Sequence, residues 1–261
     1  MSVPAPDYPQ GRDLLKDKSV LVTAAAGTGI GYAVAKRAVE EGARVLISDY
    51  HERRLGEAAE RIAEETGGAP PQTCVCDVTD QAQVDALRDA ALSSFGTLDV
   101  LINNAGLGGE APVVDMGDDE WSRVLDVTLT SLFRMTRAFL PAMYEARSGV
   151  LVNNASVLGW RAQKGQAHYA AAKAGVMAFT RCSALEAAEH GVRINAVAPS
   201  LAMHPFLAKV TSEETLAELV EREAYGRPAE VWEVANVMIF LASELSSYMT
   251  GEVVAVSSQR A

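Results

Sequence analysis

The chain has 261 residues, of which 49% are hydrophobic, and it carries 23 basic against 34 acidic residues, a formal net charge of −11. This length suits one α/β domain with a large core, and the acidic balance disfavours nucleic acid and anionic membranes as partners. No apolar stretch reaches membrane-spanning length and the start carries no signal-peptide core, so we expect a cytoplasmic protein without a membrane partner.

Strand-like apolar runs alternate with segments of helical pattern along the whole chain. Residues 1–11 are proline-rich and are expected to form an arm outside the sheet. The alternation predicts a single doubly wound, Rossmann-like α/β domain over 12–261, with a central parallel sheet of about seven strands and helices on both faces. The strand-like runs are residues 18–23, 43–48, 72–76, 99–103, 149–154, 193–198 and 252–257.

A glycine-rich turn follows the first predicted strand and precedes a helical segment over 32–41. Its glycines carry no side chain, so the backbone can approach a pyrophosphate while the helix N-terminus points free N–H groups at the anion. The alternative is a tight strand-to-helix turn with no ligand. The candidate cofactor-binding residues of this turn are Gly27, Thr28, Gly29, Ile30 and Gly31.

Asp49 ends the second predicted strand, eighteen residues after Gly31. A carboxylate at this position suits the ribose hydroxyls of NAD and repels the 2′-phosphate of NADP. Two alternatives stay open: Asp49 could cap the helix that follows, and Arg53 or Arg54 could accommodate a 2′-phosphate. We expect NAD as the cofactor, with NADP as the alternative.

Tyr169 and Lys173 are four residues apart in an Ala-rich segment of helical pattern, residues 167–189, and so share one helix face. A phenol has an unperturbed pKa of about 10 and needs a nearby cation to exchange protons at neutral pH. Lys173 can be that cation, and Ser156 can hydrogen-bond a carbonyl or carbinol oxygen while Tyr169 moves the proton. The alternative is an ordinary amphipathic pair on a solvated helix.

These motifs, in this order and spacing, resemble the short-chain dehydrogenase/reductase family over nearly the whole chain. Three further motifs carry the resemblance: Asp77-Val78 after the third strand, 103–106 (Asn-Asn-Ala-Gly) after the fourth, and 195–199 (Asn-Ala-Val-Ala-Pro) after the sixth. The resemblance implies a homotetramer that pairs helices around 121–144 and 168–190. It also implies further cofactor contacts from Asp77, Val78, Asn104, Ala105, Gly106, Pro199, Tyr169 and Lys173.

The chain departs from the family pattern at several positions. Ala25 replaces the first glycine of the turn, and Thr128 stands where the family has the asparagine of a proton relay. Thr128, or the backbone beside it, is a candidate to hold a water in that relay; a helix residue without a catalytic role is the favoured interpretation. Residues 257–259 (Ser-Ser-Gln) replace the family's Asp-Gly-Gly. Because Ser156, Tyr169 and Lys173 are retained, we expect an active enzyme.

Substrate residues are expected between the serine and the tyrosine and after the sixth strand. The loop that carries Trp160 and Gln163 would overhang the reacting carbon, although a tryptophan packed beneath the loop is the alternative. Residues 203–225 have a mostly helical pattern and would form a lid, in which Phe206 faces the pocket. His204 would line the nicotinamide or substrate mouth, with an exposed loop histidine as the alternative. The four histidines form no ligand pattern, so we expect no metal.

We therefore predict an oxidoreductase that moves a hydride between a nicotinamide cofactor and a secondary alcohol or ketone. Several phrases resemble a subgroup from actinobacterial steroid-ring breakdown, which implies a bulky hydroxy or keto acyl-CoA substrate. The alternatives are an NADPH-dependent 3-oxoacyl thioester reductase and a nucleotide-binding member of the family without activity. The three cysteines form no even-numbered framework, so free thiols are expected.

Overall fold

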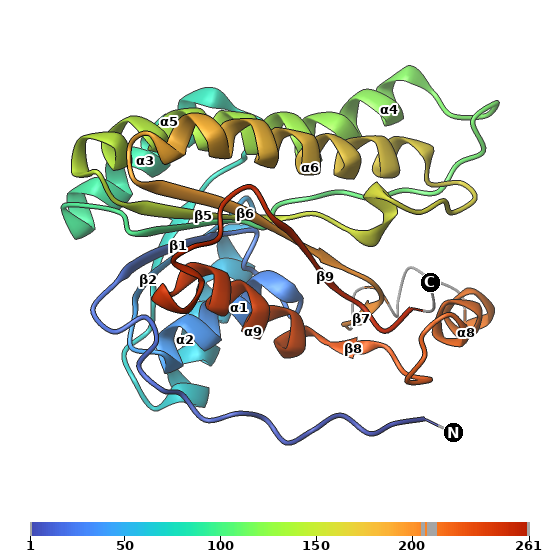
Figure 1. Ribbon diagram of the computed structural model, residues 1–261, viewed down its shortest axis with the longest axis horizontal. Coiled ribbons are helices and arrows are strands. Elements are labelled where there is room, and N and C mark those ends of the chain that lie inside the picture. Colours follow the sequence, from blue (N-terminus) through green and yellow to red (C-terminus); the bar gives the residue numbers. More distant parts are fainter. Residues whose placement is uncertain (1, 205–206, 208–212, 260–261) are drawn as a thin grey trace.

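The computed structural model describes residues 2–204, 207 and 213–259. Seven parallel strands form one sheet in the order β3-β2-β1-β4-β5-β6-β9, with helices on both faces (Figure 1). This confirms the predicted fold class. The strands are β1 (Ser19–Thr23), β2 (Arg44–Asp49), β3 (Gln72–Val75), β4 (Val100–Asn103), β5 (Gly149–Asn154), β6 (Val192–Pro199) and β9 (Val253–Val256).

Parallel neighbours need crossover connections, and helices provide them. One face of the sheet is covered by α1 (Ile30–Glu40), α2 (Glu52–Thr66) and α9 (Val231–Ala242), the other by α3 (Gln81–Phe95), α5 (Ser131–Ala146) and α6 (Ala167–Ala188) (Figure 1). The smaller elements are α4 (Asp118–Leu125), a π-helical turn (Asp126–Thr130), α8 (Glu213–Glu221), two 3₁₀ turns (Val157–Gly159 and Glu244–Ser246), and β7 (Ala202–Met203) paired with β8 (Ala229–Glu230).

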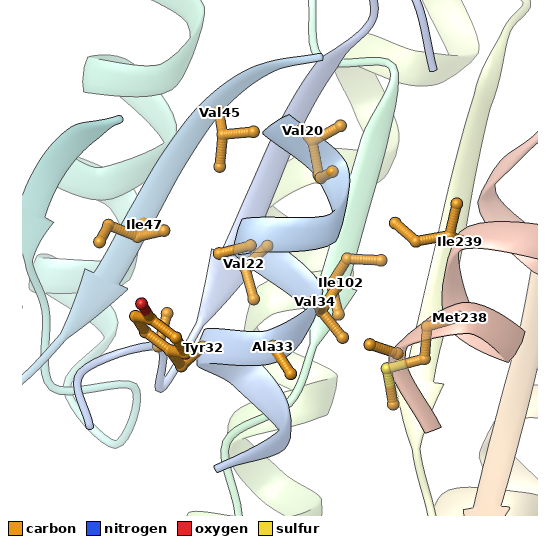
Figure 2. Close-up of a cluster of buried hydrophobic side chains, with 14 of the residues drawn as sticks. Val20, Val22, Tyr32, Ala33, Val34, Val45, Ile47, Ile102, Met238 and Ile239 are labelled. Atoms are coloured by element: carbon orange, nitrogen blue, oxygen red, sulfur yellow. The ribbon is translucent and has the colours of Figure 1, made fainter. Parts of the chain in front are cut away.

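The core lies on both faces of the sheet because successive strand residues point to opposite sides. Val20 and Val22 of β1 belong to the cluster beneath α1 and α9, where Val34 and Met238 are fully buried (Figure 2). Leu21, between the two valines, belongs to the cluster on the other face. Each such side chain contributes roughly 1.5–3 kcal/mol by burial. A sheet buried on both faces explains why its strands appear as continuous apolar runs in the sequence.

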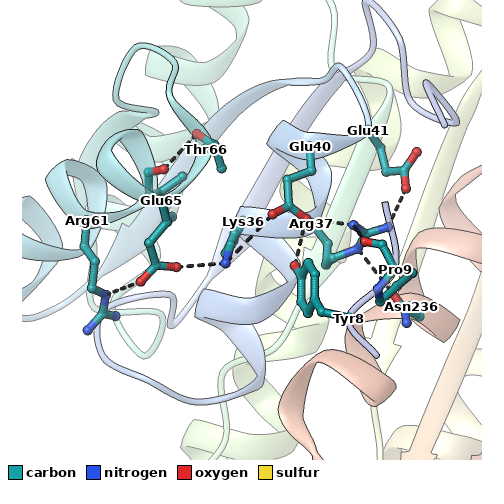
Figure 3. A network of polar contacts seen from close by, with 11 residues as sticks. Tyr8, Pro9, Lys36, Arg37, Glu40, Glu41, Arg61, Glu65, Thr66 and Asn236 are labelled. Carbon is teal, nitrogen blue, oxygen red and sulfur yellow. Dashed lines mark hydrogen bonds and ion pairs between the residues drawn. The ribbon is translucent and has the colours of Figure 1, made fainter. Parts of the chain in front are cut away.

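The N-terminal segment lies outside the sheet and is fastened to α1 and α9 (Figure 3). The Tyr8 hydroxyl donates to Glu40 Oε2 at 2.7 Å, and its ring packs edge-on against Trp232 with centroids 5.4 Å apart. Arg37, 4% exposed, donates to the carbonyl oxygen of Pro9 at 3.1 Å. The arm therefore stiffens the face of the sheet that carries α1.

The strand order places a switch point between β1 and β4. From β1 the chain runs outward through β2 and β3, then returns to β4 on the other side. The helices after β1 and β4 lie on opposite faces, which opens a crevice at the carboxyl ends of these strands, where sheets of this kind bind ligands. The glycine-rich turn follows β1 at this edge.

Candidate active site

A cavity of about 1240 Å³ lies at the carboxyl ends of β1, β2 and β4. It brings together segments that are far apart in the sequence, including both the glycine-rich turn and the ends of three strands. The predicted cofactor residues that line it are Gly27, Thr28, Gly29, Ile30, Gly31, Asp49, Asp77, Val78, Asn104, Ala105 and Gly106, together with His204. Pro199, at the end of β6, is not in this lining.

The turn after β1 is compact because its residues approach one another closely. A Cβ on Gly31 would lie 2.4 Å from both the Ala24 carbonyl oxygen and Asn104 Nδ2, so only glycine fits there. Ala24 has a left-handed backbone with φ of 52°, and Ala25 is fully buried. The alanine at the position of the missing glycine is therefore accommodated in the turn.

Asp49 is 7% exposed at the end of β2 and points its carboxylate at the backbone around the cavity. Oδ2 accepts a hydrogen bond from the Ala26 N–H at 3.2 Å and Oδ1 accepts one from the His51 N–H at 3.0 Å. Burial raises the pKa of Asp49, and the Ala26 N–H and the charge of Arg54 oppose the rise. The helix-cap alternative is wrong, because α2 has His51 at its N-cap and no side-chain cap bond.

The two arginines after Asp49 occupy different environments. Arg53 is 82% exposed and pairs with Glu57 at 2.6 Å, away from the cavity. Arg54 lines the cavity. Of these two cations, Arg54 is the one that can meet an anionic group bound beside Asp49.

Asp77 and Val78 line the cavity from the loop after β3. Asp77 Oδ1 accepts hydrogen bonds from the N–H of Thr79 at 2.9 Å and from its hydroxyl at 2.7 Å. This is the local turn chemistry of aspartate at a strand end. Asp77 therefore shapes the loop and faces the cavity at once.

Asparagine amides cross-link the strand ends beneath the cavity. Asn104 Nδ2 donates to the carbonyl oxygens of Thr23 and Ala24, both at 3.1 Å, and Asn104 Oδ1 accepts from Asn154 Nδ2 at 2.9 Å. These bonds join the ends of β1, β4 and β5. They hold the turn after β1 in register with the segment that leads to Ser156.

Ser156, Tyr169 and Lys173 come together beside this cavity, but none of the three is among its lining residues, so the lining does not include the predicted cofactor contacts of Tyr169 and Lys173. Tyr169 and Lys173 lie one turn apart on α6, and Lys173 Nζ is 5.5 Å from the centroid of the tyrosine ring. Ser156 is 9% exposed and directly precedes the 3₁₀ turn. Its hydroxyl accepts a hydrogen bond from the Leu158 N–H at 3.2 Å. Gly106 connects the cavity to this group, because a Cβ on it would lie 3.3 Å from Lys173 Nζ.

Burial dominates the protonation of this group in the protein without ligands. It lowers the pKa of Lys173 to about 7 and raises the pKa of Tyr169 to about 12, and hydrogen bonding to Ser156 opposes the rise at the tyrosine. Lys173 Nζ donates to the backbone carbonyl oxygen of Asn154 at 2.5 Å. The phenol and the amine are thus desolvated side by side, as acid–base groups in active sites commonly are.

Thr128 is 1% exposed in the π-helical turn between α4 and α5. Its hydroxyl accepts from the Leu107 N–H at 2.9 Å and donates to the Leu107 carbonyl oxygen at 3.0 Å. Both bonds fasten the loop after β4, which forms the cavity wall. The side chain is therefore engaged with protein, and the π-helical turn, a feature common at functional sites, is the part that can hold a water.

The predicted substrate residues divide between two places. His204 lines the large cavity, where burial lowers its pKa and its Nδ1 accepts from the Leu207 N–H at 3.3 Å. Gln163 lines a second cavity, and Trp160, 52% exposed, lines neither. Because its side chain is this exposed, the alternative of a tryptophan packed beneath the loop is wrong. Phe206 lies outside the described residues.

Comparison with known proteins decides the family. The protein-family model described as "Enoyl-(Acyl carrier protein) reductase" matches residues 24–258, which include the turn, the strand-end motifs and the Ser-Tyr-Lys group. The chain belongs to the short-chain dehydrogenase/reductase family. It is an oxidoreductase of a family that uses nicotinamide cofactors and acts on hydroxyl and keto groups.

Relatives of this short-chain dehydrogenase/reductase match it over nearly its full length. A (5R,7aS)-5-hydroxy-7a-methyl-1-oxo-2,3,5,6,7,7a-hexahydro-1H-indene-carboxyl-CoA reductase of Mycobacterium tuberculosis is 63% identical over 98% of this chain and 97% of its own. A 3-oxoacyl-[acyl-carrier-protein] reductase FabG of Thermotoga maritima is 36% identical over 93% and 97%. The crystal structure of a short chain dehydrogenase from Mycobacterium smegmatis has a TM-score of 0.87 and 59% identity, covering 99% of both chains.

The described part of the chain offers neither a metal site nor a membrane-spanning helix. Within it, no group of three or more histidines, cysteines, aspartates or glutamates is placed to hold a metal ion. No helix in the same part of the chain is long and apolar enough to cross a membrane. The cysteines at 74, 76 and 182 are free thiols.

Sequence reasoning missed the side chains that reach the site from distant elements. Arg61 of α2 donates to the Gly27 carbonyl oxygen and lies 3.8 Å from the centroid of the Tyr32 ring, so it braces the glycine-rich turn. Trp121 of α4 lines the large cavity. Neither residue belongs to a motif, and only the folded chain brings them to the turn.

Proposed function

We propose that this enzyme interconverts a secondary alcohol and a ketone on a fused-ring CoA thioester, with NAD(H) as its cofactor. The observation that carries the substrate class is the 63% identity, over nearly both chains, to a reductase named for a hydroxy-oxo-hexahydroindene carboxyl-CoA. An indene ring pair with an angular methyl group has the framework of the last two rings of a steroid. The proposal therefore places the substrate among the products of steroid-ring breakdown.

The proposed chemistry uses three side chains of this chain. The Ser156 hydroxyl orients and polarises the substrate oxygen, and Tyr169 gives its phenolic proton to that oxygen in reduction or accepts it in oxidation. In its charged form, Lys173 would lower the pKa of the phenol. A bound nicotinamide dinucleotide supplies or accepts the hydride. The backbone of the π-helical turn at Thr128 would hold the water that passes the proton onward.

The residues around the large cavity fit such a dinucleotide. The turn ending at Gly31 offers backbone N–H groups at the start of α1 and leaves no room for a side chain, as a pyrophosphate site requires. Asp49 would accept the hydroxyls of the adenosine ribose, and Asp77 and Val78 would contact the adenine. The buried carboxylate favours NAD over NADP, because a 2′-phosphate would lie against it. Gly106 would let the nicotinamide end approach Lys173.

Both alternatives have weaker support. The alternative of a 3-oxoacyl thioester reductase is supported by a FabG relative that is 36% identical to this chain. The indene-carboxyl-CoA reductase is more similar, at 63% identity. The alternative of a nucleotide-binding member without activity rests on Ala25 and Thr128. Ala25 fits inside the turn and Thr128 fastens the cavity wall at Leu107, which supports an active enzyme over this alternative.

We further propose a cytoplasmic homotetramer in which residues 203–225 cover the substrate. The helices expected to pair, α5 and α6, expose Phe133 at 41% and Leu185 at 74%. Apolar side chains exposed on neighbouring helices favour association with another copy. Sedimentation velocity of the purified protein tests the tetramer.

Nicotinamide absorbance tests the proposed reaction. NAD(H) and NADP(H) would each be paired with ring-bearing and linear hydroxy or keto compounds, supplied as CoA thioesters and as free acids. We expect turnover of a ring-bearing thioester with NAD(H). Turnover of linear thioesters with NADPH would move the assignment to 3-oxoacyl reduction, and binding of cofactor without turnover of any compound would favour the non-catalytic alternative.

A further inference from the structure

A second cavity, of about 250 Å³, adjoins the loop that follows Ser156. Two guanidinium groups and two side-chain amides face this small space. Leu158, one of its lining residues, is two positions after Ser156, so the cavity lies next to the segment that carries the serine. Its lining residues are Leu158, Arg161, Ala162, Gln163, Arg222 and Gln259.

The cavity is built by the C-terminal tail docking on the segment after α8. Glu223 is 3% exposed, and its Oε2 accepts from the backbone N–H of Ser258 at 3.2 Å and from its hydroxyl at 2.7 Å. The Ala224 N–H donates to the Ser258 carbonyl oxygen at 2.6 Å, and Glu223 pairs with Gln259 in an antiparallel bridge. These contacts hold Arg222, the neighbour of Glu223, beside the tail.

Gln259 in turn positions the second arginine. Arg161 Nη1 donates to Gln259 Oε1, which joins the loop after Ser156 to the tail. Over residues 2–204, 207 and 213–259, neither Arg161 nor Arg222 forms an ion pair with a carboxylate. Both guanidinium groups line the same small cavity, which concentrates positive charge there in a protein of net charge −11. Planar guanidinium groups match the oxygens of a phosphate in two-point hydrogen bonds.

We propose that Arg161 and Arg222 bind a phosphate group of the CoA part of the substrate. The inference rests on the proposed function, which places a CoA thioester at Ser156. The phosphates of CoA lie far along the molecule from the thioester carbon, so they contact the rim of the site and not the reacting centre. Gln163 supplies an amide donor to the same space. The substitutions at residues 258 and 259, where the family has glycines, provide the side chains that build the site.

Variants of the two arginines test this site. Arg161→Gln, Arg222→Gln and the double variant would be compared with Arg88→Gln, a surface change on α3 where the arginine pairs with Asp89 at 2.8 Å. The measurement is the KM for the CoA thioester divided by the KM for the N-acetylcysteamine thioester of the same acid. The second compound carries no phosphate. We expect the ratio to rise about three- to tenfold for each arginine removed and to stay constant in the control.

The outcomes separate this inference from the proposed function. An unchanged KM ratio in the double variant would overturn the phosphate site. An equal rise in both KM values would also overturn it, since the arginines would then bind a group on the acyl part. Calorimetric binding of free CoA tests the site without turnover: we expect weaker binding by the double variant, and equal binding would contradict the inference even if no thioester proves to be a substrate.

Discussion

The Nζ atom of Lys173 donates a hydrogen bond to the backbone carbonyl oxygen of Asn154 across 2.5 Å. Asn154 donates in turn from Nδ2 to Asn104 Oδ1 at 2.9 Å. Helix α6 is thereby tied to the ends of β5 and β4, beside the large cavity. The same bond satisfies an amine that is 2% exposed and that would otherwise be desolvated without a partner.

The buried amine predicts a pH-dependent stability. Lys173 has a pKa of about 7 in the folded protein, lowered by burial from 10.5. Between these values the unfolded chain binds more protons than the folded one, so the unfolding free energy of the wild type rises with pH, by up to ~1.4 kcal/mol for each pH unit. Lys173→Met removes this contribution. Urea denaturation of both cofactor-free proteins between pH 7 and 9.5 measures the difference.

The comparison between the two proteins cancels the other titrating groups. Tyr169 is present in both proteins, and burial raises its pKa to about 12. Its contribution to the unfolding free energy therefore falls only above pH 10.0, the ordinary pKa of tyrosine. We expect the wild type to gain stability relative to Lys173→Met as pH rises through this window. Parallel pH profiles would contradict the desolvated amine.

Gly31→Ala should damage both folding and cofactor binding. The added Cβ would lie 2.4 Å from the Ala24 carbonyl oxygen and from Asn104 Nδ2, a contact that forces the turn or the asparagine to move. We expect a loss of about 1–3 kcal/mol in unfolding free energy and weaker cofactor binding. Gly56→Ala is the matched control, because Gly56 is exposed on α2 and nothing lies within 4 Å of its added Cβ. The unfolding free energy of this variant should rise by about 0.5–1 kcal/mol. Equal effects of the two changes would refute the close-packed turn.

Asp49→Ala should reduce the discrimination between the two cofactors. Loss of the carboxylate removes acceptors for the ribose hydroxyls and removes the repulsion of a 2′-phosphate, so we expect NAD to bind about tenfold more weakly and NADP more tightly. Arg53→Gln, at an exposed residue paired with Glu57, should leave the preference unchanged. Fluorescence titration with both cofactors measures it, and a preference unaltered in Asp49→Ala would mean that this carboxylate only organises the loop at Ala26 and His51.

Thr128→Val should destabilise the cavity wall. The change leaves the Leu107 N–H and carbonyl without the hydroxyl that now bonds to both, and each unpaired group costs about 1–3 kcal/mol. Thr128→Ser keeps the hydroxyl and should retain most of the stability. Thermal unfolding of the two variants measures the contrast, and equal melting temperatures would show that the two hydrogen bonds contribute nothing.

The strands were predictable from the sequence because the sheet is buried on both faces. The run at 149–154 coincides with β5, and that at 18–23 exceeds β1 by one residue. The helix after the turn begins at Ile30, two residues before its predicted start, because Gly29 is already the N-cap and Gly31 lies in the first helical turn. Glycines inside a helix look like a loop in the sequence.

The parts that the sequence did not predict depend on contacts between distant segments. The cavity beside the Ser156 loop is lined by Arg161, Arg222 and Gln259, which come from a loop, the segment after α8 and the tail, and no spacing rule connects them. In the predicted lid, helix α8 spans Glu213–Glu221, and Met203 joins a small sheet with β8. Short strands of two residues have no alternating pattern to detect.

The most direct test of the central claim is turnover and cofactor binding by Tyr169→Phe on a substrate that the wild type converts. Removing one hydroxyl oxygen leaves the ring on α6 and removes the group that exchanges the proton. We expect turnover to fall by about 10²-fold or more while the cofactor dissociation constant stays within about threefold of the wild type. Turnover near the wild-type rate would contradict the role of Tyr169 and the mechanism built on it.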